Sequence, residues 1–377
     1  MFTPRQHATA PVGALSRVRT PRWVRALPVL LVAVDLIAEY AASAHIAAGF
    51  PLAVLPVLVA FGYGPGAVAL STVGAVALQG AMAERVGHLT EQHHVWIYLA
   101  TALAGVLGAV LSWQRNRQEH DLVQVRSVAE ALQRTVLHPV PPRSGGLRTA
   151  GLYRAAQAEV PIGGDLYSIC ETRYGTRVLL GDVRGKGLDA VRTVADLLGA
   201  FRAVADETEH LNDLADLLDR QLQRVAGDRD DQELFATATL LQHDPGTGRC
   251  LLVNRGHHAP LLIGPAGVRA VDAPEQLPLG LGGLSLAAPA APVAFTLEPG
   301  HTLLLYTDGL SEARDPAGAF YPVAERLTTL TALPGTDPEH LVTALDEDVR
   351  TRCGPLTDDL AILALTPVGP GSDAPSD

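Results

Sequence analysis

The feature that most constrains the fold is an apolar segment at residues 26–113, in which Leu, Val, Ala and Gly dominate. A helix needs about 20 apolar residues to cross the roughly 30 Å hydrocarbon core of a bilayer. The segment therefore has room for four membrane spans. We expect them at residues 27–46, twice within residues 47–82 on either side of a Gly-Tyr-Gly-Pro-Gly turn at 62–66, and at residues 95–113.

Arginines flank this segment on both sides. Arg17, Arg19, Arg22 and Arg25 precede the first predicted span, and Arg115 and Arg117 follow the last one. Positive charge beside a span favours the cytoplasmic side, so both flanks are expected there and the number of spans must be even. The sequence predicts a multi-pass cell-membrane protein with a cytoplasmic tail at residues 1–25 and a cytoplasmic domain after residue 113.

An alternative explanation of the basic start and the apolar run is a cleaved signal peptide, with Ala-Ser-Ala at residues 42–44 as the cleavage site. Asp35 and Glu39 argue against it because they interrupt the apolar run. These two acids share one helical face. We expect this face to pack against other spans near an aqueous pocket, with binding of a ligand or a proton by the acids as the alternative. Three histidines, His88, His93 and His94, indicate a polar extracytoplasmic loop, with metal binding or pH sensing as the alternative.

Charge and cysteine content exclude several classes of protein. The chain has 29 basic and 40 acidic residues, and the acidic excess lies after residue 113. Because phosphate backbones select basic surfaces, we expect no nucleic acid as a partner of that part. Cys170, Cys250 and Cys353 lie far apart and form no metal-binding or disulfide pattern, which is typical of a reducing compartment.

An amphipathic connector helix is predicted at residues 114–141. Its apolar residues Leu122, Val125, Ala129, Leu132 and Val136 follow one another at steps of three and four. This heptad seam predicts that the helix pairs with the same helix of a second copy, and hence a homodimer. The alternative is that the helix packs on the following domain of its own chain. Prolines at 139, 141 and 142 end the helix, so we expect a folded domain at residues 142–366 and a flexible tail at residues 367–377.

The domain at residues 142–366 alternates short apolar runs with helical patterns. Strands are expected at residues 177–183, 235–242, 250–254, 260–263, 301–307 and 360–365, and helices at residues 188–205, 211–225, 323–330 and 338–352. The helices fall in pairs between groups of strands. This order favours an α+β domain in which helices cover the sheets.

Acidic residues stand beside predicted strands, in most cases next to glycine. They are Asp165 after Gly163-Gly164, Asp182 within Gly-Asp-Val-Arg-Gly-Lys-Gly at 181–187, Asp308 within Thr-Asp-Gly at 307–309, and the pair Asp358-Asp359. Carboxylates gathered in one place repel one another unless a divalent cation neutralises them, and hard oxygen ligands suit magnesium or manganese. Two such ions can activate water for in-line attack on a phosphate ester. Asp-Gly alone is foremost a turn signal, and spacing does not show that the acids converge.

Six motifs follow in a recognisable order. They are Gly-Gly-Asp at 163–165, Gly-Asp-Val-Arg-Gly-Lys-Gly at 181–187, Phe-Ala-Thr-Ala at 235–238, Asn-Arg-Gly-His at 254–257, Leu-Leu-Tyr-Thr-Asp-Gly-Leu-Ser-Glu-Ala at 304–313 and Asp-Asp-Leu-Ala at 358–361. The chain closely resembles the bacterial stage II sporulation E-type branch of the PPM-type metal-dependent protein phosphatases, in particular membrane-anchored actinobacterial members. The resemblance implies a helix-flanked antiparallel β-sandwich with α-β-β-α layers. It also implies hydrolysis of phosphoserine or phosphothreonine with two manganese or magnesium ions.

The resemblance also implies a role for each acid. Asp182 would bridge both ions, and the Val183 carbonyl would bind one of them. Asp308 and Asp358 would hold the other ion, with Asp165 completing the site directly or through water. Asp359 would only support its loop.

The sequence departs from the eukaryotic relatives in one respect. Those relatives have a histidine after the glycine of the Asp-Gly motif, and this histidine is a candidate general acid. Here Val183, Arg184 and Gly185 follow Asp182, so the sequence assigns no side chain as the proton donor, and water is the alternative. Arg184 and Lys186 would bind substrate phosphate or serve as surface charges. The Asn-Arg-Gly-His segment that contains His257 is expected to be a turn at a strand end rather than a metal site.

The resemblance implies a membrane-anchored protein phosphatase whose substrates are phosphorylated anti-sigma factor antagonists. Two other functions are weighed against it. A non-catalytic scaffold with the same fold is disfavoured by the intact Asp165, Asp182, Asp308 and Asp358. A two-metal phosphodiesterase is disfavoured by the acidic domain and by the resemblance itself.

Overall fold

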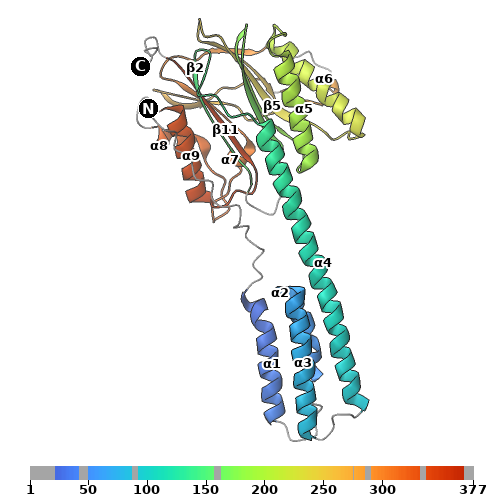
Figure 1. The fold of residues 1–377 in the computed structure, drawn as a ribbon. Coiled ribbons are helices and arrows are strands. Elements are labelled where there is room, and N and C mark those ends of the chain that lie inside the picture. The colour runs from blue at the N-terminus through green and yellow to red at the C-terminus, as the bar shows by residue number, and fades with distance from the viewer. Residues whose placement is uncertain are drawn as a thin grey trace, which may run out of the picture. The chain divides into compact units, whose positions relative to one another are not determined.

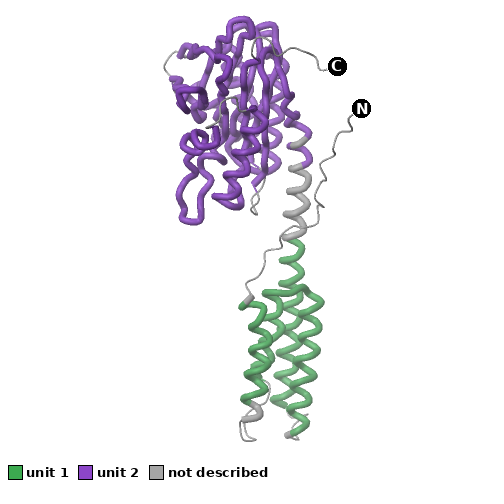
Figure 2. The backbone as a smooth tube through the Cα atoms, turned by 90° about the vertical axis from the view of Figure 1, so that its left-hand side faces the viewer, with its two compact units in different colours: residues 1–124 green, residues 125–377 purple. Residues whose placement is uncertain are grey.

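The computed structural model describes residues 22–41, 50–86, 92–156, 163–274, 276–284, 290–331 and 337–368. The chain divides into two compact units, residues 1–124 and residues 125–377 (Figure 2). Each unit has its own core, and each is described by itself.

The first unit is helical, as predicted. It contains α1 (Arg22–Ala41), the 3₁₀ helix η1 (Phe50–Val54) with α2 (Leu55–Gly62), α3 (Pro65–Val86) and the first part of α4 (Gln92–Val136). The predicted Gly/Pro turn separates α2 from α3. Residues 65–85 and 92–118 are each long and apolar enough to cross a membrane, whereas the apolar helix at residues 50–62 is shorter. The number of spans stays a prediction.

Small and polar side chains join the helices of this unit. A Cβ added at Gly105 would lie 2.3 Å from the Thr72 hydroxyl oxygen, so α3 and α4 approach closely there. Gln79 donates a buried hydrogen bond to Thr101 at 3.0 Å. Asp35 is buried in α1. The side chain of Glu39 and the residue His88 lie outside the described residues. His93 and His94 are predicted in a polar loop, but they lie in the first turn of α4, where His94 is buried.

The predicted connector is continuous with the last predicted span, because α4 runs as one 45-residue helix to Val136. The side chains of Leu122, Val125 and Ala129 lie outside the described residues. Leu132 is exposed, whereas Val136 packs against the core of the second unit. The end of α4 therefore lies on the following domain, and pairing through the seam stays a prediction.

The second unit is a sandwich of two antiparallel sheets. One sheet has the strand order β1 (Arg143–Ser144), β2 (Leu147–Arg154), β11 (Leu360–Pro367), β10 (Thr302–Tyr306), β7 (Leu261–Gly264) and β8 (Gly267–Ala270). The other has the order β3 (Asp165–Thr172), β4 (Gly175–Val183), β5 (Ala236–His243), β6 (Arg249–Arg255) and β9 (Val293–Thr296).

Helices cover the outer face of each sheet (Figure 1). Helices α5 (Leu188–Val204) and α6 (Leu211–Arg229) pack on the five-stranded sheet, and α8 (Val323–Leu330) and α9 (Pro338–Cys353) pack on the six-stranded sheet. Central strands are thus covered on both faces, which explains the unbroken burial of residues 176–181 in β4. The predicted helix-flanked antiparallel fold is confirmed.

Candidate active site

Three carboxylates meet where the two sheets come together. Asp165 begins β3 and lies directly opposite Asp182 near the end of β4. Asp308 follows β10 and opens the short helix α7 (Asp308–Ser311). One oxygen from each of these side chains lies within 4.8 Å of the others. The structure therefore brings together, from both sheets, three of the four aspartates predicted as metal ligands.

Two glycines let the backbone segments of this site approach. The Val183 amide donates to the Gly164 carbonyl at 3.0 Å, and a Cβ on Gly164 would lie 2.0 Å from the Val183 carbonyl oxygen. A Cβ on Gly309 would lie 1.8 Å from the carbonyl oxygen of Asp359. Both distances are below any real van der Waals contact. The glycines beside the acids are therefore required for close backbone packing.

Asp358 lines the same pocket but lies outside the group of three. Its two carboxylate oxygens accept hydrogen bonds from the Lys186 ammonium at 3.0 and 3.1 Å. The pocket has a volume of about 340 Å³ and is lined by Gly163, Gly164, Asp182, Val183, Arg184, Gly185, Lys186, Phe235, Thr237, Asp308 and Asp358. Most of the residues predicted for the site thus border one cavity.

Burial and mutual repulsion perturb these acids. Burial first, and then the charges of Asp308 and Asp358, raise the pKa of Asp182 to about 7. Burial and Asp182 raise the pKa of Asp165 well above its usual range. Burial and Asp358 also raise the pKa of Asp308. Ionised carboxylates so arranged need a cation, and their hard oxygen donors fit magnesium or manganese.

Thr307 belongs to the site, although the sequence motif that contains it predicts no role for its side chain. Its buried hydroxyl donates to Asp165 at 2.7 Å and accepts from the Ala361 amide at 2.9 Å. It therefore fixes the Asp165 carboxylate, from one sheet, to β11 of the other. Only its place before the Asp-Gly pair could have indicated this role.

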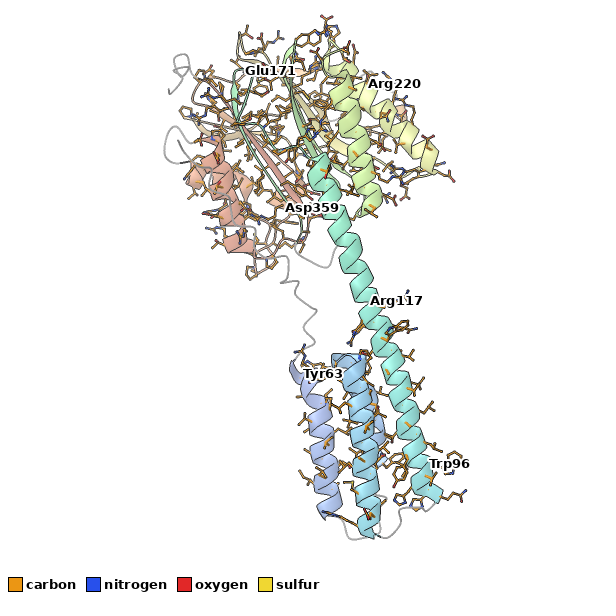
Figure 3. All side chains as sticks on the ribbon, viewed as in Figure 1. Tyr63, Trp96, Arg117, Glu171, Arg220 and Asp359 are labelled. Atoms are coloured by element: carbon orange, nitrogen blue, oxygen red, sulfur yellow. The ribbon has the colours of Figure 1, made fainter. Side chains whose placement is uncertain are left out.

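Asp359 supports the loops of the site, as the resemblance implies. Its side chain is 2% exposed and accepts hydrogen bonds from the Ala156 and Gly163 amides, both at 2.9 Å. The Tyr153 hydroxyl also donates to it. The carboxylate of Asp359, which is labelled in Figure 3, thus accepts hydrogen bonds from three groups of the protein.

His257 joins the two sheets and lies outside the carboxylate group. Its Nε2 donates to the Tyr306 carbonyl at 3.1 Å, which leaves Nδ1 to accept from the Thr237 hydroxyl at 2.8 Å. Burial lowers the pKa of His257 to about 4, so the ring is neutral at pH 7. These contacts give His257 a structural position, in agreement with the expectation of a strand-end turn.

The two cationic candidates differ in their partners. Arg184 pairs with the Glu233 carboxylate at 2.6 Å and donates to the Glu233 carbonyl at 3.0 Å. Lys186 pairs only with Asp358 among the described acids. Both side chains line the pocket, but of the two only Lys186 pairs with one of the predicted metal-binding acids.

A model of the stage II sporulation protein E family matches residues 172–367. The chain belongs to this family. Its second unit has the fold of PP2C-type phosphatase domains. The matched residues include Asp182, Asp308 and Asp358.

Two solved structures share this fold. The SiaA PP2C domain of Pseudomonas aeruginosa is 16% identical with a TM-score of 0.54, and the match covers 66% of this chain and 98% of that one. The RsbU and RsbW domains of a Mycobacterium tuberculosis protein are 23% identical with a TM-score of 0.51. That match covers 60% of this chain and 61% of the M. tuberculosis chain, so the present chain spans about three fifths of that relative.

Proposed function

We propose that this protein is a membrane-anchored, metal-dependent phosphatase that removes phosphate from phosphoserine or phosphothreonine of anti-sigma factor antagonists. The observation that carries the proposal is the meeting of Asp165, Asp182 and Asp308 within 4.8 Å of one another, with Asp182 and Asp308 lining the pocket. Membership of the stage II sporulation protein E family supports the reaction. The RsbU and RsbW domains of the M. tuberculosis relative support the class of substrate.

Four aspartates and one carbonyl would hold two manganese or magnesium ions. They are Asp165, Asp182, Asp308, Asp358 and the carbonyl of Val183. When bound, such ions polarise the phosphoryl group and activate water for in-line attack. The described lining of the pocket contains no Ser, Cys or His. Its aspartates would be engaged as metal ligands, and its one hydroxyl, that of Thr237, is paired with His257, whose lowered pKa makes it a weak base. The lining therefore favours direct attack by water over a covalent intermediate on the protein.

Lys186 would bind the substrate phosphate. Its ammonium lies at the pocket beside Asp358, where it can pair with a dianionic phosphoryl group once Asp358 ligates a cation. The Arg184 guanidinium, already paired with Glu233, would contribute to the rim that receives the phosphoprotein.

The first unit would anchor the protein in the cell membrane with the phosphatase domain in the cytoplasm. Most of the exposed large apolar side chains among the described residues belong to this unit. Trp96 and Trp113 are exposed on α4 and are separated by about 26 Å at 1.5 Å per residue, which is close to the thickness of a hydrocarbon core. Figure 3 shows Trp96 and Arg117 toward opposite ends of this part of α4, an arrangement typical of membrane interfaces.

Topology reporters would test the anchoring. A reporter fused after His120 should be cytoplasmic, and one inserted near Gly87 should be extracytoplasmic. Both tags on the same side would contradict an even number of spans. A homodimer through the α4 seam belongs to the same proposal, and crosslinking in membranes would test it.

The full-length chain in lipid nanodiscs should hydrolyse p-nitrophenyl phosphate and a phosphoserine protein when Mn²⁺ is present. Absence of both activities would favour a scaffold. Turnover of a cyclic dinucleotide without turnover of the phosphoprotein would favour a phosphodiesterase. A phosphoproteome comparison of cells with the native chain and with Asp182→Ala would identify the substrate.

A further inference from the structure

A hydrogen bond joins the carboxylate site to the six-stranded sheet. The hydroxyl of Tyr153, on β2, donates to the carboxylate of Asp359, which is 2% exposed. Both residues belong to the second unit.

Asp359 is connected to the segments that carry three of the site's acids. Its carboxylate accepts from the Gly163 amide, two residues before Asp165. It follows Asp358 directly, and its carbonyl oxygen is the atom that a Cβ on Gly309 would strike, next to Asp308. A shift of Asp359 therefore displaces all three segments together.

Tyr153 is the only side chain among the described residues that donates a hydrogen bond to this carboxylate. The other two donors are backbone amides of the loop that Asp359 holds, so they move with the loop. Tyr153 lies on a central strand of the six-stranded sheet and is fixed by pairing with Ala361. It therefore supplies the fixed point against which Asp359 is oriented.

We propose that Tyr153 is a positioning residue that sets metal affinity by orienting Asp359. The inference rests on the proposed metal-dependent function of the site. Residues that orient metal ligands through hydrogen bonds commonly change affinity or activity by about 10–100-fold when they are removed.

The first test is Mn²⁺ binding to the full-length chain, measured from the electron paramagnetic resonance signal of free Mn²⁺. Tyr153→Phe should weaken Mn²⁺ binding by about 10–100-fold. The matched control is Tyr321→Phe, because the Tyr321 hydroxyl also donates to a carboxylate, that of Asp348, at 2.6 Å but away from the site. Tyr321→Phe should lower the melting temperature and leave Mn²⁺ affinity unchanged.

The second test is a double-mutant cycle with Asp359→Asn, which keeps the shape of the side chain and removes the charge that accepts the Tyr153 hydrogen bond. Asp359→Asn alone should weaken Mn²⁺ binding, and Tyr153→Phe should have little further effect in that background. If Tyr153→Phe does not fold, native Mn²⁺ affinity in Asp359→Asn would overturn the proposal. Native Mn²⁺ affinity in a folded Tyr153→Phe protein would overturn the role of Tyr153.

These outcomes are separate from a failure of the proposed function. A native chain that binds Mn²⁺ but does not hydrolyse phosphoproteins would contradict the phosphatase proposal alone. Equal Mn²⁺ affinity of native and Tyr153→Phe chains, with hydrolysis intact, would contradict the positioning role alone. A native chain that does not bind Mn²⁺ would contradict both.

Discussion

Asp165 and Asp182 are direct cross-strand partners in the antiparallel pair β3–β4. Side chains at such positions share one face of the sheet with Cβ atoms about 5 Å apart, and like charges there destabilise the pair. A shift of the pairing by one residue would move one of the acids to the opposite face. The strand register itself thus creates the centre of the site. The repulsion between the two carboxylates lowers the stability of the fold, and a bound cation would offset this repulsion.

Asp182→Asn should reduce Mn²⁺-dependent hydrolysis by several orders of magnitude, because the amide removes an anionic ligand at the centre of the carboxylate group. Asp308→Asn should have a similar effect. Initial rates with a phosphoserine protein would measure both losses. Asp206→Asn is the control, since Asp206 pairs with Arg173 at the surface. Near-native rates in either site variant would show that the ligands are wrongly assigned.

The metal-free chain should lose stability as the pH rises from about 4 to about 7. The pKa of Asp182 is raised from 3.8 to about 7 in the fold, so the folded state binds its proton more tightly than the unfolded state does. The resulting stabilisation is present below pH 4 and is lost as the pH rises through 7. Thermal unfolding in a metal chelator between pH 4 and pH 8 would measure this loss.

Asp182→Asn should flatten that pH dependence and melt a few degrees higher than the native chain at pH 7.5 without metal, since about 1 kcal/mol corresponds to roughly 2–4 °C in a domain of this size. Mn²⁺ should raise the melting temperature of the native chain and not that of the variant. A melting temperature independent of pH in the native chain would contradict the raised pKa.

Gly309→Ala should abolish activity and destabilise the phosphatase domain by at least about 1–3 kcal/mol, because the new Cβ collides with the backbone of Asp359. Gly199→Ala is the matched control. Gly199 lies within α5 with no atom near the position of an added Cβ, so alanine there should be neutral or stabilise by about 0.5–1 kcal/mol. Chemical denaturation would compare the two, and similar stability losses would contradict the argument from close approach.

Control through α4 should depend on helical register. Two residues inserted after Arg126 rotate the two parts of the helix by about 200° relative to each other, whereas seven residues nearly preserve their register. We expect the two-residue insertion to change phosphatase rates in membranes strongly and the seven-residue insertion to change them little. Equal rates from both insertions would identify α4 as a passive tether.

The sequence predicts strands in the middle of both sheets and misses most strands toward the edges. Residues 177–183 and 360–365 are predicted as strands and correspond to β4 and β11, because burial on both faces favours Val, Leu, Ile and Ala. The predictions miss β1, β3, β8 and β9 at the sheet edges, and also β2. The sequences of β2 and β3, Leu-Arg-Thr-Ala-Gly-Leu-Tyr-Arg and Asp-Leu-Tyr-Ser-Ile-Cys-Glu-Thr, mix charged, small and aromatic residues without clear alternation.

Hydrogen bonds between residues far apart in the chain could not be predicted from the sequence either. Arg177 would be placed at the surface by residue type, yet it is fully buried and donates to the carbonyls of Ala205 and Glu209, which end α5 and precede α6. The Thr307 hydroxyl finds Asp165 across 142 residues of chain. Motif glycines and acids indicated which segments matter, whereas the hydrogen bonds that orient them arise only from the packed sandwich.

The hydroxyl of Thr307 joins a carboxylate of one sheet to the backbone of the other, and the remaining acids also come from both sheets. Metal affinity therefore depends on the packing of the two sheets against each other, and not merely on the presence of strands and helices. A molten globule that kept its secondary structure but lost fixed packing would separate Asp165 from Asp308. Such a state would retain the circular dichroism of strands and helices and would bind no manganese at this site.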